Sequence, residues 1–167
     1  MRFSLLPWVI ADRVTELTVE FLHQEEIELL MLDFDNTIVP YTTNEPAEDV
    51  AAWLTALKAS DIHLCVVSNS HKDRVKIFCE AWGIDCITHA RKPFRKGIWQ
   101  CMVKYGIPPD HCALVGDQIF TDTLGANRTG VNPILVRAIH NHNIWLKLRH
   151  VAELPFILAA KKRRMNI

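Results

Sequence analysis

The chain has 167 residues, and its 19 lysines and arginines balance 19 aspartates and glutamates, giving a formal net charge of zero. This length suits one domain of ordinary size, and 49% apolar with 23% charged residues is typical of a folded globular protein rather than a disordered chain. The balanced charge argues against binding to nucleic acid through bulk positive charge, and the longest apolar run without charge, at 3–11, has about half the length that a membrane-spanning helix requires.

Residues 1–11 resemble a short signal peptide with Arg2 as its charged end. However, Pro7 interrupts the apolar stretch, and Asp12 and Arg13 follow at once where a cleavage site needs small neutral residues. We therefore expect this segment to belong to the mature protein.

Short apolar runs alternate with helical patterns along the rest of the chain. The predicted strands are 27–33, 62–67, 85–88, 112–116 and 131–136. Two predicted helices carry apolar stripes at offsets of 0, 3, 4 and 7. These stripes are Val50, Trp53, Leu54 and Leu57, then Val75, Phe78, Cys79 and Trp82. A third helix is predicted from Pro93 to Tyr105 and a fourth at 120–129, with Gly106 and Gly130 ending them. Strands that alternate with crossover helices predict a parallel sheet in a three-layer α/β sandwich.

The cysteines and histidines give no sign of a disulfide framework or a zinc site. Five cysteines form no CxxC pair and lie in or beside apolar stretches, so we expect reduced, packed thiols in a cytoplasmic protein. Among the eight histidines, His140 and His142 share a polar turn and are expected to face solvent.

Polar side chains follow every predicted strand except the last. In a parallel sheet the chemistry gathers at the carboxyl ends of the strands, so these side chains are expected at one edge. They are Asp33, Asp35 and Thr37, then Ser68, Asn69 and Ser70, then Lys92, and finally Asp117 and Asp122.

Asp33 and Asp35 stand in the string Asp33-Phe34-Asp35-Asn36-Thr37. Alternation at the end of a strand points both carboxylates to the same side, where they could serve as nucleophile and general acid/base. A pair of turn-forming or helix-capping aspartates is the structural alternative, because both are common after strands.

Four aspartates at one edge would repel one another. Two unit charges 4 Å apart cost about 4 kcal/mol at an effective dielectric of 20, so the cluster calls for a bound cation, and an all-oxygen set suits Mg²⁺. Lys92 would add a second positive charge against phosphoryl oxygens. The alternative interpretation is that Lys92 belongs to a solvated basic loop with Arg91, Arg95 and Lys96.

Ser68-Asn69-Ser70 ends one predicted strand and precedes a helix. Hydroxyl and backbone N–H groups in this position can bind an anion, whereas ordinary helix N-capping is the alternative. We expect Ser68, next to the strand, to be a phosphate ligand and Ser70 to cap the helix.

Together these residues resemble the haloacid dehalogenase (HAD) superfamily of phosphohydrolases over about 27–136. The four motifs of that superfamily are matched in chain order by Asp33 and Asp35, Ser68, Lys92, and Asp117 and Asp122. The resemblance implies a Rossmann-like sheet of strand order 3-2-1-4-5. Flanking residues look like a narrower group, the IIIA phosphatases, which includes bacterial proteins and a mitochondrial phosphatidylglycerophosphate phosphatase. These flanking residues are Leu5-Leu6-Pro7, Val67-Ser68-Asn69, Ala90-Arg91-Lys92-Pro93, Gly116-Asp117-Gln118, Thr121-Asp122, Gly125 and Asn127-Arg128.

The resemblance also implies a role for each site residue. Asp33 attacks phosphorus and forms an aspartyl-phosphate, and Asp35 is the general acid and then the general base. Lys92 is catalytic and also binds the phosphoryl group with Ser68 and Asn69. The ligands of Mg²⁺ are Asp33, the backbone carbonyl of Asp35, Asp117, and Asp122 directly or through water.

The chain departs from the superfamily pattern at two places. Asn36 stands where much of the superfamily has glycine, a change that the narrower group shares. Pro40-Tyr41 replaces the acidic or aromatic residues often seen in the flap, which leaves recognition of the leaving group open.

Spacing and the C-terminal sequence bear on the substrate. Asp33 and Ser68 are 35 residues apart, and Ser68 and Lys92 are 24 apart, so we expect a single domain over 1–167 without a cap and with an open site. Residues 145–167 carry six lysines or arginines and one glutamate among apolar side chains, within a basic amphipathic segment at about 142–167. Such a segment could bind an anionic membrane surface. The alternative interpretation is a C-terminal helix that packs on the domain.

Our leading hypothesis is a cytoplasmic Mg²⁺-dependent phosphatase that acts on phosphatidylglycerophosphate at the inner face of the membrane, with an anionic phospholipid headgroup as partner. The alternative is a soluble phosphatase of a small metabolite or a phosphoprotein. A non-catalytic binding module that kept the fold is a third interpretation, and the presence of every catalytic position argues against it.

Overall fold

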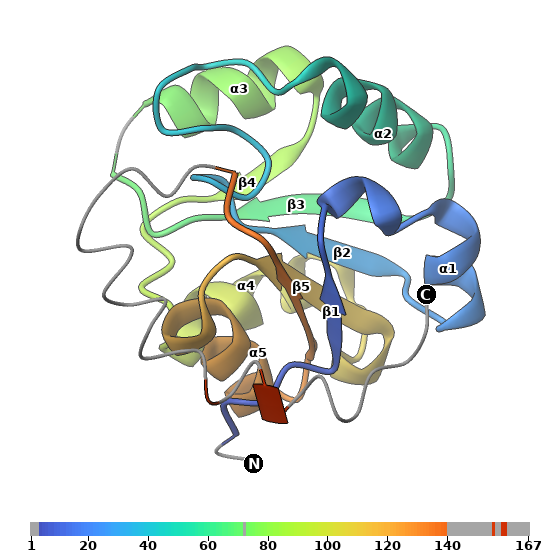
Figure 1. The fold of residues 1–167 in the computed structure, drawn as a ribbon, viewed down its shortest axis with the longest axis vertical. Coiled ribbons are helices and arrows are strands. Elements are labelled where there is room, and N and C mark those ends of the chain that lie inside the picture. Colours follow the sequence, from blue (N-terminus) through green and yellow to red (C-terminus); the bar gives the residue numbers. More distant parts are fainter. Residues whose placement is uncertain (1–3, 72, 140–154, 156–157, 160–167) are drawn as a thin grey trace.

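The computed structural model describes residues 4–71, 73–139, 155, 158 and 159, and shows a parallel sheet between two layers of helices (Figure 1). Within these residues the sheet has six strands in the order β1-β6-β5-β2-β3-β4, and every neighbouring pair is parallel. The strands are β1 (Val9–Ala11), β2 (Leu29–Leu32), β3 (His63–Val67), β4 (Asp85–Ile87), β5 (Cys112–Gly116) and β6 (Asn132–Val136).

Helices cover both faces of this sheet. Figure 1 shows α2 and α3 above the sheet and α4 and α5 below it, and α1 packs on the same face as α2 and α3. A π-helical turn at Ile119–Thr123 leads into α5. The helices are α1 (Val19–Gln24), α2 (Glu48–Lys58), α3 (Arg74–Trp82), α4 (Arg95–Tyr105) and α5 (Leu124–Thr129).

The sheet divides the core into two clusters, and β2, one of its two middle strands, contributes side chains to both. Its side chains alternate between the two faces, because successive residues of a strand point in opposite directions. Leu30 and Leu32 pack in the cluster under α1, α2 and α3, whereas Leu29 and Met31 pack in the cluster under α4. All four side chains are fully buried, and burial of each stabilises the fold by about 1.5–3 kcal/mol. The centre of the sheet therefore provides a firm base for the site residues after β2.

The predicted α/β sandwich is confirmed, and all five predicted strands are present, with ends shifted by at most two residues. Leaving β1 aside, their order is the 3-2-1-4-5 that the resemblance implied. The predicted stripe of α2 is buried in full, and Gly106 and Gly130 end α4 and α5 in the left-handed conformation. The third helix begins at Arg95 rather than Pro93, since Phe94 is still extended.

A strand and an α-helix near the N-terminus were not predicted. β1 extends the sheet beyond β6 through the pairs Val9 with Ile134 and Ala11 with Val136, and α1 begins after Thr18, whose hydroxyl accepts the backbone N–H of Phe21. Three residues are too few to show a strand period, and a helix of one and a half turns shows no stripe. The apolar run at the start of the chain thus contributes a strand of the sheet.

The cysteine side chains agree with the prediction of reduced, packed thiols. All five cysteines are free, and four of them are buried while Cys86 is half-buried. His140, His142 and the basic segment at about 142–167 lie outside the described residues, apart from Pro155, Leu158 and Ala159. Among the described residues there is no helix with the length and apolarity needed to cross a bilayer.

Candidate active site

The predicted site residues meet at the carboxyl edge of the sheet because the strands that deliver them are neighbours. β2 lies between β3 and β5, with Met31 paired to Cys65 on one side and to Leu114 on the other. Asp33 comes directly after β2, and Asp117 comes directly after β5. Residues far apart in sequence are thus placed together by strand order.

Three buried aspartates form the centre of the site. Asp33, Asp117 and Asp122 are at most 8% exposed, and one carboxylate oxygen from each lies within 4.8 Å of the others. Burial raises the pKa of Asp122 to about 6; Lys92 opposes this rise and Asp33 adds to it. An ionised Asp122 is therefore costly in this buried cluster unless a cation lies beside it.

Lys92 contacts two of these aspartates from inside the protein. Its Nζ lies 2.7 Å from Asp33 Oδ1 and 2.8 Å from Asp122 Oδ1, and its side chain is 1% exposed. Burial alone would lower the pKa of Lys92, but the carboxylates of Asp122 and Asp33 raise it above the usual value. The alternative of a solvated basic loop is therefore wrong for Lys92.

The Asn69 side chain holds the backbone of Lys92 in place. Its Oδ1 accepts the Lys92 N–H at 2.6 Å, and its Nδ2 donates to the Lys92 carbonyl oxygen at 2.9 Å. Each polar atom of the Asn69 amide thus has a partner within the protein, and Nδ2 keeps a second N–H that can donate to a ligand.

Ser68 is fully buried at the end of β3. Its hydroxyl oxygen accepts the backbone N–H of Ser70 at 3.0 Å, which leaves the hydroxyl hydrogen to donate to a ligand. The prediction that Ser70 caps the following helix is wrong, because α3 begins at Arg74 with Asp73 in the capping position. The loop after β3 is longer than the apolar stripe of α3 suggested.

Thr37 and Asn36 shape the turn behind Asp33. The Thr37 hydroxyl lies 3.5 Å from Asp33 Oδ2 and 3.4 Å from Asp117 Oδ1, at the long end of hydrogen-bond distance. Asn36 is fully buried with φ of 68°, in the left-handed region. Glycine and asparagine adopt this conformation most readily, which explains why Asn can stand where much of the superfamily has glycine.

Asp35 lies beside the cluster and has a partner that the sequence did not indicate. Its Oδ1 is 3.3 Å from Nη1 of Arg74, the first residue of α3, and the two side chains are 18% and 12% exposed. The apolar stripe of α3 begins at Val75, so nothing in the pattern distinguished Arg74 from an exposed helical arginine. The position of Arg74 is set by the loop after β3, whose path only the folded chain defines.

Comparison with known proteins agrees with this arrangement. The sequence model of a family described as haloacid dehalogenase-like hydrolase matches residues 11–136. The chain belongs to this family. It is also 30% identical over 162 residues to the probable phosphatase YqeG of Bacillus subtilis (strain 168), covering 97% of this chain and 94% of that protein.

Solved structures with low sequence identity share the fold of this HAD hydrolase. The cobalt-bound deoxy-D-mannose-octulosonate 8-phosphate phosphatase of Haemophilus influenzae has a TM-score of 0.55 at 13% identity, covering 83% of this chain and 91% of that one. A putative subfamily IIIA HAD hydrolase of Legionella pneumophila has a TM-score of 0.52 at 15% identity, covering 87% and 95% of the two chains.

The residues at the centre of this HAD site fit a divalent cation, which hydrolases of the family use. Three buried carboxylates face one buried ammonium, so two negative charges are in excess when all are ionised. A divalent cation supplies that charge, and carboxylate oxygens are the ligands that hard cations such as Mg²⁺ prefer. Asp33, Asp117 and Asp122 are therefore the side chains that would hold it.

Gly116 leaves the space that Asp122 occupies. A Cβ at position 116 would lie 2.4 Å from Asp122 Oδ2 and 2.3 Å from its Cγ. Asp122 is held on both sides, because its Oδ1 pairs with Lys92 and its Oδ2 accepts the Gln118 N–H. No side chain other than hydrogen fits at this position without displacing the aspartate.

Gly116→Ala is expected to move Asp122 out of the cluster. We expect a loss of about 1–3 kcal/mol in unfolding free energy from overpacking, and a higher concentration of divalent cation for half-maximal activity. Thermal unfolding and a titration with a divalent cation measure both effects. Gly106→Asn is the control, because no atom lies within 4 Å of the added Cβ and Asn tolerates φ of 70°. An unchanged requirement for divalent cation in Gly116→Ala would contradict this account of the cluster.

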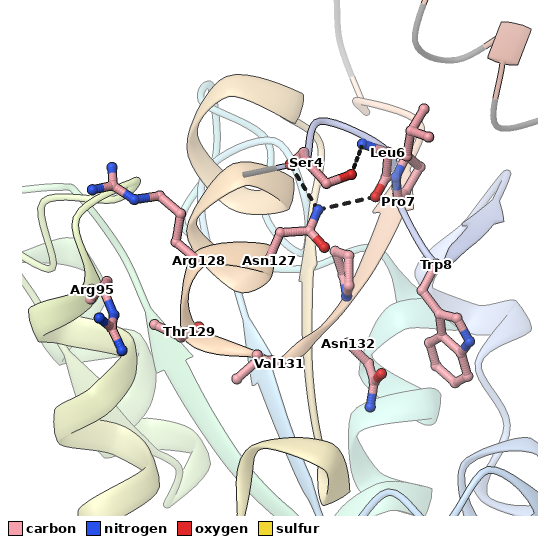
Figure 2. Close-up of a pocket in the computed structure, with 12 residues that line it drawn as sticks. Ser4, Leu6, Pro7, Trp8, Arg95, Asn127, Arg128, Thr129, Val131 and Asn132 are labelled. Carbon is pink, nitrogen blue, oxygen red and sulfur yellow. Dashed lines mark hydrogen bonds between the residues drawn. The ribbon is translucent and has the colours of Figure 1, made fainter. Parts of the chain in front are cut away.

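A separate hollow of about 520 Å³ is lined in part by flanking residues that resemble the narrower group. It lies where the end of α5 and the start of β6 meet the N-terminal segment (Figure 2). Asn127 Nδ2 donates to the carbonyl oxygens of Ser4 and Leu6, at 2.9 and 3.1 Å (Figure 2). Asn127 thus ties the segment before β1 to α5, and none of the site aspartates lines this hollow.

Proposed function

We propose that this chain is a Mg²⁺-dependent phosphomonoester hydrolase. The observation that carries the proposal is the position of Asp33, which has Lys92 within 2.7 Å and lies in one buried cluster with Asp117 and Asp122. A carboxylate that the Lys92 ammonium holds in place is suited to attack phosphorus, whereas the alternative role was to cap a helix. The family match and the relative described as a probable phosphatase support the same activity, and the chain is accordingly a phosphatase.

The first half of the proposed reaction forms a covalent intermediate. A carboxylate oxygen of Asp33 attacks phosphorus in line with the ester bond, so that a new O–P bond forms as the bond to the leaving oxygen breaks. Asp35 donates its proton to the departing alkoxide, which leaves as an alcohol. The products of this half are aspartyl-phosphate on Asp33 and an ionised Asp35.

The second half regenerates the enzyme. Asp35 removes a proton from a water molecule as its oxygen attacks the phosphorus of the intermediate, and the O–P bond to Asp33 breaks. Inorganic phosphate leaves, Asp33 is again a carboxylate, and Asp35 is again protonated. One carboxyl group can perform both transfers because each half leaves it in the state that the other needs.

Charge on the transferred phosphoryl group has to be balanced throughout. We assign this task to the Lys92 ammonium, the Ser68 hydroxyl and the backbone N–H of Asn69. Mg²⁺, held by Asp33, Asp117, Asp122 and the Asp35 carbonyl oxygen, would neutralise the charge that the phosphate brings to an already acidic site. The all-oxygen donor set supports Mg²⁺ as the ion.

We also propose that the enzyme is a single capless domain of the IIIA group. The connections after β2 and β3 are residues 33–47 and 68–73, and both are too short to form a folded cap. The flanking motifs, including the Asn127 tie to the N-terminal segment, support the subfamily. An uncapped site is open to substrates with a bulky leaving group.

Two substrate classes are favoured by different observations. Six basic residues among apolar side chains in 145–167 favour phosphatidylglycerophosphate, which the enzyme would reach from the cytoplasm at the inner face of the membrane. The likeness in fold to deoxy-D-mannose-octulosonate 8-phosphate phosphatases of Haemophilus influenzae and Yersinia pestis favours a soluble phosphate ester. The open site admits both.

A phosphate-release assay with a substrate panel tests the proposal. The panel contains phosphatidylglycerophosphate in vesicles, a sugar-acid phosphate, a phosphopeptide and 4-nitrophenyl phosphate, each with Mg²⁺ and with EDTA. We expect release from at least one ester that stops in EDTA and returns with Mg²⁺. Preference for the vesicle substrate supports the lipid, and efficient release from a soluble ester alone would overturn it. No release from any ester would contradict the proposed activity.

A further inference from the structure

Arg74 joins the candidate general acid to the loop after the first motif. Its Nη1 lies 3.3 Å from Asp35 Oδ1 and donates to the Tyr41 carbonyl oxygen at 3.2 Å. Its Nη2 donates to the carbonyl oxygens of Pro40, at 2.9 Å, and Thr43. One guanidinium therefore binds a carboxylate and three backbone carbonyls from a single short stretch of chain.

The guanidinium is also held from the core side. It stacks over the ring of Phe34, 5.0 Å from the ring centroid, and Phe34 is fully buried with an edge contact to Phe78 of α3. Phe34 stands between the two catalytic aspartates in the sequence. A guanidinium fixed on this ring has one orientation relative to Asp35, and the planar fork of arginine suits several acceptors at once.

We propose that Arg74 is a positioning residue that holds the Asp35 carboxylate and the loop at 40–43 in one fixed arrangement. The inference rests on the proposed function, in which Asp35 transfers protons to and from oxygen. The pair is largely shielded from water, unlike a surface ion pair, and a catalytic acid has to lie within hydrogen-bond reach of the leaving oxygen. In this scheme Arg74 neither transfers a proton nor binds the phosphoryl group.

Substrates with different leaving groups can show whether Arg74 positions the acid Asp35 or has only a general structural role. A nitrophenolate leaves without help, whereas an alkoxide needs a proton from Asp35. Loss of the Arg74 contact should therefore affect an alkyl phosphate far more than an aryl phosphate. A lysine at position 74 could reach Asp35 with its charge but lacks the fork for the three carbonyls, so its effect should be intermediate.

The test compares glycerol phosphate and 4-nitrophenyl phosphate as substrates of Arg74→Met, Arg74→Lys and the wild type. Arg74→Met should lose about 10–100-fold in kcat/KM on the alkyl ester and no more than about 3-fold on the aryl ester. Adding Arg74→Met to Asp35→Asn should produce little further loss on the alkyl ester, because the acid is already absent. Arg13→Met is the control, since its ion pair with Asp49 lies on the surface.

Equal losses on both esters, or full additivity with Asp35→Asn, would overturn the inference while leaving the phosphatase intact. Amide hydrogen exchange supplies a readout without activity, because the Thr43 N–H bonds to the Pro40 carbonyl oxygen within the loop that Arg74 holds. Arg74→Met should speed exchange at Thr43 while the amides of β2 stay protected. If the wild type cleaves neither of these two esters, the substrate panel still decides the proposed function, and unchanged Thr43 exchange would overturn the role of Arg74.

Discussion

Asp33→Asn is expected to lower phosphate release by at least about 10³-fold while the protein stays folded. The amide keeps the shape of the side chain and can still accept from Lys92, but it cannot form the bond to phosphorus. Its neutral charge also removes one repulsion inside the cluster with Asp117 and Asp122, so the unfolding free energy should change by no more than about 1 kcal/mol. Phosphate release and thermal unfolding of the same preparation measure both quantities.

Asp12→Asn is the matched control for this substitution. Asp12 pairs with Arg137 at 3.1 Å, with both side chains more than half exposed, so its loss should leave turnover unchanged. Phosphate release by Asp33→Asn at the wild-type rate would contradict its role as the nucleophile. Loss of activity together with unfolding would show a structural role instead.

Lys92→Met is expected to have the largest effect on stability among the site residues. The variant leaves Asp33 and Asp122 buried without their cation, and removal of one partner from a buried ion pair costs about 3–5 kcal/mol. Turnover should also fall about 10²-fold or more, because a fixed positive charge at the phosphoryl group is lost. Chemical unfolding in EDTA and phosphate release measure the two effects.

The difference in unfolding free energy between the wild type and Lys92→Met depends on pH with a definite sign. The pKa of Lys92 is raised in the folded state, so its contribution to stability is complete below the pKa of the unfolded side chain and is lost only as pH rises through the folded value. The cost of Lys92→Met should therefore not fall between about pH 7 and 9, because the wild type keeps this contribution there while the pKa of Asp122, which Lys92 holds down, rises further in the variant. Lys104→Met is the control, since its exposed ion pair with Asp85 should contribute less than about 1 kcal/mol. A cost for Lys92→Met no greater than that of the control would contradict the buried pair.

The sequence predicted the parts of this molecule that depend on local pattern and strand order. Largely apolar runs of five to seven residues located β2, β3, β5 and β6, and a parallel sheet then places the residues after these strands at one edge. That Asp33 and Asp117 lie side by side could be predicted only with the strand order that the family resemblance implied. The identity of the family was inferred from the same residues.

The parts that the sequence left open depend on contacts between loops. Asn69 was predicted as a phosphate ligand, but its side chain clamps the backbone of Lys92, 23 residues away. Arg74 reaches the loop at 40–43 from the start of α3, which begins three residues later than a Ser70 cap would place it. A hydrophobic pattern does not predict contacts of this kind. Each contact joins two loops, and it forms only where the lengths and paths of both loops bring the residues together.

The covalent intermediate on Asp33 is the most direct test of the account. Asp35→Asn should still transfer phosphate from 4-nitrophenyl phosphate, whose leaving group needs no proton, but should hydrolyse the intermediate slowly because the base is gone. We predict a burst of nitrophenolate equal to the enzyme concentration, and phosphate on the peptide that contains Asp33 after an acid quench. Absence of the burst and of bound phosphate, or phosphate on a different residue, would contradict the account.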